Sequence, residues 1–74
     1  MYKLIATSNE EMWKYEGQLL EVRRGIDGRL YASNDKLEGG GFVTSQLMTD
    51  IEHDDIRFVV THHNTYVFRK EEIK

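Results

Sequence analysis

The feature that most constrains this chain is a pair of strand-like runs near its end, residues 56–61 (IRFVVT) and 65–69 (TYVFR). Both runs are rich in β-branched and aromatic residues and flank a polar break at residues 62–64, a pattern that predicts a β-hairpin. We expect a loop of three residues with Phe58 opposite Phe68, because this register keeps arginine away from the large apolar side chains. The face that it would bury consists of Phe58, Val60, Tyr66 and Phe68.

The length of 74 residues limits the chain to a single domain, residues 1–74. A domain of this size buries only roughly 60% of the surface of its unfolded chain. The sequence has no cysteine, so disulfides and thiolate metal sites cannot reinforce the core. Short strand-like runs separated by turn residues recur along the sequence. We therefore expect an all-β fold, a small antiparallel meander or an SH3-like barrel with one short helical turn.

The segment that follows the first predicted strand, residues 2–7, fits two local structures. Ser8 and Glu11 match the capping box of a short helix. Trp13 and Tyr15, however, alternate with polar residues as in a half-buried strand. We prefer the strand, which would pair with residues 2–7 as a further hairpin, and the short helix is the alternative.

Residues 18–24 and 29–33 predict a middle hairpin. Its loop, residues 26–28, would have three residues, with Gly28 in the left-handed conformation that such loops require. This loop length fixes the register. The pairs that it predicts are Val22 with Ala32, Arg23 with Tyr31, and Arg24 with Leu30.

Residues 33–41 (SNDKLEGGG) end in three consecutive glycines, which predict an exposed mobile loop. The glycines are not followed by the lysine–serine or lysine–threonine pair of a phosphate-binding P-loop, nor by a long helix. After a short strand, Thr44 or Ser45 could cap a helical turn with Leu47 and Ile51 on one side. This turn is the expected helical element of the fold.

Composition and spacing exclude several functions. No apolar run approaches the roughly 20 residues that span a bilayer, and the first residues lack the apolar core of a signal peptide, so we expect no membrane partner and a cytoplasmic location. The net charge of −3 gives no general attraction to nucleic acid. No catalytic triad, carboxylate pair or helical metal motif is present among His53, His62, His63 and their neighbours. We expect no enzyme activity, catalytic residue, cofactor or bound metal.

Residues 50–55 (DIEHDD) hold four carboxylates within six positions, more than turning a chain requires. A solvated turn is one explanation. The functional alternative is a fixed acidic patch, which speeds association with a basic protein surface. We predict a protein partner that binds this turn and the 62–64 loop expected beside it, and a homodimer stays open. The predicted partner-binding residues are Asp50, Glu52, His53, Asp54, Asp55, His62, His63 and Asn64.

The middle hairpin supports a second hypothesis, a small nucleic-acid-binding β-barrel. Its residues Arg23, Arg24, Arg29 and Tyr31 could present guanidinium groups and an aromatic ring to a nucleic acid. The structural explanation of the same residues is a strand edge protected by charge, with Arg23 stacked on Tyr31.

The chain also has a family resemblance in its layout. The residues that carry it are Thr44, Ser45, Ile51, Thr61, Asn64, Thr65, Tyr66 and Phe68, within an acidic, cysteine-free composition. In these features the chain resembles the small all-β accessory proteins of tailed phages and prophages, a group that includes inhibitors of bacterial immunity. The resemblance implies a stoichiometric inhibitor of a host or defence factor in the bacterial cytoplasm, and it implies no particular site residue.

Overall fold

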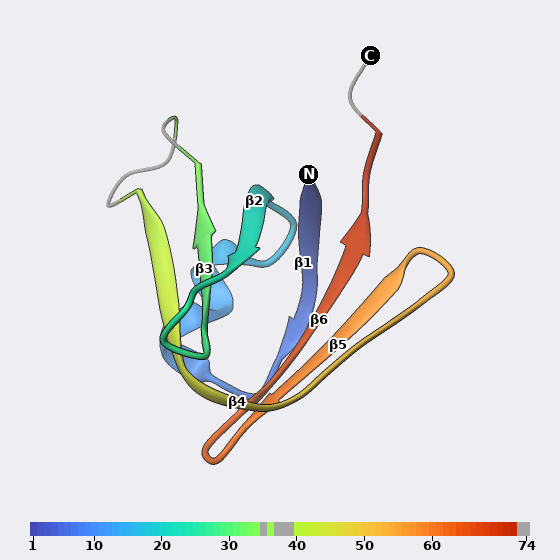
Figure 1. The fold of residues 1–74 in the computed structure, drawn as a ribbon. Helices are drawn as coiled ribbons and strands as arrows, with labels where there is room; N and C mark the ends of the chain where they lie inside the picture. Colours follow the sequence, from blue (N-terminus) through green and yellow to red (C-terminus); the bar gives the residue numbers. More distant parts are fainter. Residues whose placement is uncertain (35, 37–39, 73–74) are drawn as a thin grey trace.

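The structure is a computed structural model that describes residues 1–34, 36 and 40–72 (Figure 1). Each strand within this part pairs antiparallel with the next, and the last pairs with the first, so the strands close a barrel in chain order. The all-β prediction is confirmed in the form of a closed antiparallel meander. The elements are β1 (Tyr2–Thr7), the 3₁₀ helix η1 (Glu10–Tyr15), β2 (Leu19–Arg24), β3 (Arg29–Ser33), β4 (Gly41–His53), β5 (Ile56–Thr61) and β6 (Thr65–Lys70).

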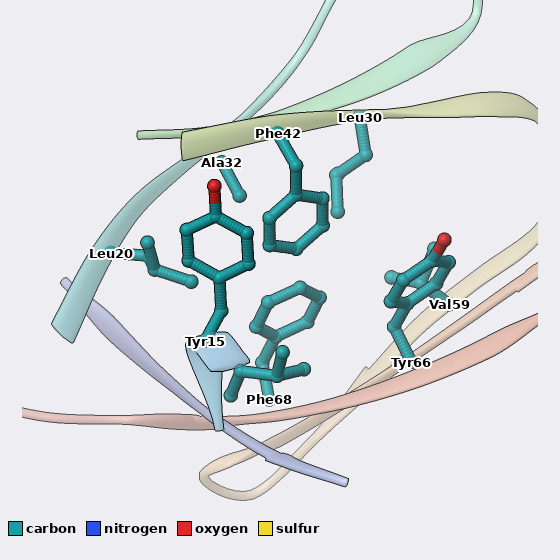
Figure 2. Packing of buried hydrophobic residues seen from close by; sticks show 9 residues of the cluster. Tyr15, Leu20, Leu30, Ala32, Phe42, Val59, Tyr66 and Phe68 are labelled. Carbon is teal, nitrogen blue, oxygen red and sulfur yellow. The ribbon is translucent and has the colours of Figure 1, made fainter. Parts of the chain in front are cut away.

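A series of aromatic rings fills the barrel (Figure 2). Tyr15 packs against Phe42 with ring centroids 5.1 Å apart, Phe42 lies 5.7 Å from Tyr66, and Tyr66 lies 6.5 Å from Phe68. Tyr2 meets the ring of Phe68 edge to face at 6.3 Å. Offset and edge contacts of this kind stabilise aromatic pairs beyond their burial. The aliphatic side chains buried around the rings are Leu4, Leu20, Leu30, Ala32 and Val59.

The segment after β1 is helical, so the hairpin preferred from sequence is wrong and the helical alternative is right. Its N-cap is Asn9, whose side-chain oxygen accepts a hydrogen bond from the backbone N–H of Glu11, and not Ser8. The helix delivers Tyr15 into the barrel, where its hydroxyl donates to the carbonyl of Gly41 at 3.0 Å. Trp13 stays 53% exposed. The alternating pattern in the sequence placed Trp13 and Tyr15 on the same face, so it could not predict that one is buried and the other exposed.

The helix also closes the seam between β1 and β2, which pair at only two positions. Beyond them, Gly17 donates its backbone N–H to the carbonyl of Leu4 at 2.7 Å. The indole N–H of Trp13 donates to the carbonyl of Thr7 at 3.0 Å, and Glu16 accepts from the backbone N–H of Thr7 at 3.2 Å. Backbone N–H and C=O groups near a core need hydrogen-bond partners. At this edge of β1 the partners come from the helix and from the two residues directly after it, and not from a strand.

The C-terminal hairpin forms, but its predicted register is wrong by one residue. Val59 pairs with Tyr66 and is fully buried, whereas Phe58 is 51% exposed on the outer surface. A one-residue shift turns a whole strand over. The turn contains four residues because Thr61 closes it. Its backbone N–H donates to the carbonyl of Asn64 at 2.9 Å, and its hydroxyl oxygen accepts from the N–H of Asn64 at 3.1 Å.

The helical turn predicted after Thr44 is also wrong, because β4 is one strand of 13 residues. Thr44 is buried, and its hydroxyl oxygen accepts a hydrogen bond from the backbone N–H of Leu30 at 3.1 Å. Register irregularities in the pairing with β3 and again between Leu47 and Thr49 bend the strand. The bend lets β4 pair first with β3 and then with β5, and it leaves Ile51 57% exposed on the outer surface.

The middle hairpin matches its prediction, with Arg23 opposite Tyr31 and the predicted pairs on either side. Gly28 has a φ of +78°, the left-handed conformation expected for its loop. The predicted mobile loop is outside the described residues at positions 35 and 37–39.

Candidate interaction surfaces

The acidic segment 50–55 is not one exposed turn, because its first four residues belong to β4. Asp50 accepts two hydrogen bonds from the guanidinium of Arg57, at 2.8 and 2.6 Å. The two side chains are only 10% and 15% exposed. The hydrogen bonds from Arg57 hold the pKa of Asp50 below its ordinary value. Asp50 is therefore committed to a buried ion pair and does not contribute to a surface patch.

Glu52 is bound as well. It accepts a hydrogen bond of 2.6 Å from the hydroxyl of Tyr2, and this bond, with burial, raises the pKa of Tyr2. The guanidinium of Arg57 lies 5.5 Å from the centroid of the same ring. The predicted register placed Arg57 away from the core. In the structure Arg57 lies beside the core, where Asp50 neutralises its charge and its guanidinium faces the ring of Tyr2.

The acidic turn that remains consists of Asp54 and Asp55. The side chain of Asp54 is 88% exposed, and one of its carboxylate oxygens lies 3.7 Å from Nε2 of His53. The 62–64 loop lies at the opposite end of β5 (Figure 1). A strand of six residues spans about 20 Å. The predicted partner-binding residues are therefore distributed over two ends of the barrel and do not form one surface.

A surface that the sequence did not reveal crosses β4, β5, β6 and β1. Ile51 pairs with Phe58, Phe58 with Val67, and Val67 with Ala6, so these four residues form one row in register, here called the apolar row. Ile51 is 57% exposed and Phe58 is 51% exposed. Phe58 was assigned to the core, so only the correct hairpin register could have identified this row.

A basic row borders the apolar row on the same outer surface. His53 pairs with Ile56, Ile56 with Arg69, and Arg69 with Lys3. Glu71 lies 2.7 Å from the guanidinium of Arg69 and 4.0 Å from the ammonium group of Lys3, and Arg69 lowers its pKa. Two cations share one carboxylate at the β6 and β1 end of this row, whereas the carboxylate of Asp54 lies beside His53 at its β4 end.

The second predicted site is partly assembled. Arg23 and Tyr31 are neighbours across β2 and β3, and both line two open hollows with volumes of about 390 and 370 Å³. Arg29 is exposed at the start of β3. Arg24 is exposed at the end of β2 and also lines the hollow of about 390 Å³, although its strand partner is the buried Leu30.

Within the described ranges, no three histidine, cysteine, aspartate or glutamate side chains are grouped closely enough to hold a metal ion. The described residues also include no helix with the length and apolar composition needed to cross a membrane. Fold and surfaces together define a small closed antiparallel barrel with an apolar row on one side and an arginine–tyrosine face on another. Comparisons with protein-family models, curated proteins and solved structures found no match to the chain.

Proposed function

We propose that the chain is a non-enzymatic protein-binding module that docks its partner on the apolar row. The observation that carries the proposal is the register of Ile51, Phe58, Val67 and Ala6 across four adjacent strands. Isolated apolar residues are common on protein surfaces, but continuous apolar patches mark interaction sites. Neighbouring strands lie about 4.8 Å apart, so the row extends for roughly 15 Å.

The margin of the row indicates the chemistry of the partner. Lys3 and Arg69 share the single carboxylate of Glu71, so a partner with an acidic edge beside its own apolar strip would complement this surface. An apolar centre within a charged rim is the usual anatomy of a protein interface. The occupant is therefore a different protein with an apolar strip and an acidic margin. The family resemblance favours a bacterial host or defence factor, inhibited by stoichiometric binding.

The decisive experiment compares Phe58→Ser with Ile26→Ser as baits in a bacterial lysate. Ile26 is fully exposed in the turn after β2, away from the row, so it is a matched control for losing an apolar side chain. A protein retained by the parent and by Ile26→Ser, but not by Phe58→Ser, is then purified and titrated by calorimetry. We expect Phe58→Ser to weaken its affinity by at least about 10-fold.

Two results would overturn the proposal. One is a purified partner that binds Phe58→Ser as tightly as the parent. The other comes from light scattering on the purified chain alone: a dimer that Phe58→Ser dissociates would make a second copy the occupant of the row. The melting temperature of Phe58→Ser serves as the folding control, and we expect it to fall by only roughly 4–10 °C because the side chain is half exposed.

A further inference from the structure

Tyr31 is fixed in place on the outer surface of β2 and β3. Its hydroxyl donates a hydrogen bond to the carboxylate of Asp27, which also accepts from the backbone N–H of Arg29 at 3.0 Å. A Cβ atom added at Gly25 would lie 2.5 Å from Cε1 of Tyr31, so the ring occupies the space that any side chain at position 25 would need. One turn therefore holds the ring at its hydroxyl and along one edge.

The space around the ring is open. Hollows of about 390 and 370 Å³ are both lined by Tyr31 and Arg23. In the part of the chain that the structure describes, the cation–ring contacts involve Lys14 with Tyr15 and Arg57 with Tyr2, and neither uses Tyr31. The stacking of Arg23 on Tyr31, considered from sequence, is thus absent among the described residues. The guanidinium of Arg23 is available to another group.

We propose that this face binds a nucleotide unit of a single-stranded nucleic acid, with the base stacked on Tyr31 and the phosphate contacted by Arg23 and Arg29. A fixed aromatic ring accepts any base, because every base has a flat face, and arginine suits phosphate oxygens. Asp27 acts as a positioning residue, since its carboxylate is engaged by Tyr31 and by the backbone of Arg29. The face uses other strands than the apolar row, so this inference does not depend on the proposed protein partner.

The test is a fluorescence anisotropy titration of a labelled short oligothymidine with the purified chain at several salt concentrations. Tyr31→Leu should weaken binding roughly 5- to 150-fold, the loss expected for one stacked base. Arg23→Gln should weaken binding and reduce the slope of log K against log salt by about one. Lys70→Gln, which removes an exposed cation from β6, is the matched control and should change neither affinity nor slope by a comparable amount.

Three further arms separate the alternatives. Tyr31→Phe keeps the ring but loses the bond to Asp27, so it should bind more weakly than the parent and more tightly than Tyr31→Leu. If Tyr31→Leu fails to fold, Tyr31→Phe and Arg23→Gln decide the result. Free thymidine monophosphate as competitor distinguishes a strand site from a mononucleotide site. Equal affinity of the parent, Tyr31→Leu and Arg23→Gln for oligothymidine would overturn the inference. Polyglutamate tests whether the face binds any polyanion. If it displaces the oligonucleotide and Tyr31→Leu weakens polyglutamate binding to the same extent, the inference is also overturned.

Discussion

Replacing Val59 by alanine should destabilise the domain more than replacing Phe58 by alanine, although phenylalanine is much the larger residue. Val59 is fully buried, and the 51% exposure of Phe58 leaves half of that side chain in water. Val59→Ala removes two buried carbons at about 0.8 kcal/mol each and leaves a cavity, for a total of about 2–3 kcal/mol. Phe58→Ala loses about 1 kcal/mol of partial burial and strand preference.

These costs are large for a domain of this size. At 0.05–0.15 kcal/mol per residue, the free energy of unfolding for 74 residues is about 4–11 kcal/mol. A loss of 2–3 kcal/mol would lower the melting temperature by roughly 10–20 °C, against roughly 4–8 °C for Phe58→Ala. Urea unfolding followed by circular dichroism measures both differences, and equal m-values for the two variants confirm that the denatured states are comparable. A greater loss for Phe58→Ala than for Val59→Ala would refute the register of β5 and with it the apolar row.

Three further predictions concern stability. Asp50→Asn removes the charge that neutralises the Arg57 guanidinium in a part-buried pair, so it should cost about 1–3 kcal/mol at neutral pH. Because the folded protein lowers the pKa of Asp50, the stabilisation is present above the ordinary pKa of about 4 and is lost as the pH falls further; urea unfolding should show parent and variant converging in acid, and a gap that persists there would contradict the ion pair. Gly41→Ala would drive Cβ into the carbonyl oxygen of Ala32, a backbone contact that cannot yield, so the variant should melt at a lower temperature than the parent. A melting curve like that of the parent would contradict the β3–β4 pairing. Trp13→Phe removes the bond to the β1 carbonyl and should cost about 1 kcal/mol, with faster amide exchange at the seam; unchanged exchange would count against this closure.

Local chemistry determined which features could be predicted from the sequence. The middle hairpin was predictable because Gly28 alone, in the left-handed conformation, fixes the loop length. The C-terminal hairpin has no glycine in its loop, and its register depends on the hydroxyl of Thr61 and on a buried ion pair between β4 and β5. The ion pair contradicts the rule that arginine avoids the inner face, and the Thr61 hydroxyl fixes a turn length that no residue type in the loop predicts. The helix depends on a contact between residues far apart in the sequence, the packing of Tyr15 against Phe42 in the core, which no local pattern indicates.

The same limits explain why the candidate surfaces were only partly predicted. Arg23 and Tyr31 were placed together because they belong to the hairpin whose register was right. The residues of the apolar row come from four strands, and two of its pairs depend on β4 and β1 pairings that no local pattern specifies. Segment 50–55 resembles a loop in composition, yet its first carboxylates are satisfied by Arg57 and by Tyr2.

The bend in β4 gives this small barrel two separable surfaces. The first half of β4 pairs with β3 beside Tyr31, and the second half pairs with β5 beneath the apolar row, so the two faces lie on different sides of the barrel (Figure 1). Binding at one face should leave the other accessible. Phe58→Ser should therefore keep the affinity for oligothymidine, and Tyr31→Leu should keep the affinity for a partner captured through the row. Calorimetry and anisotropy on both variants test this independence. A parallel loss of both activities in either variant, with the melting temperature preserved, would mean that one continuous surface binds both ligands.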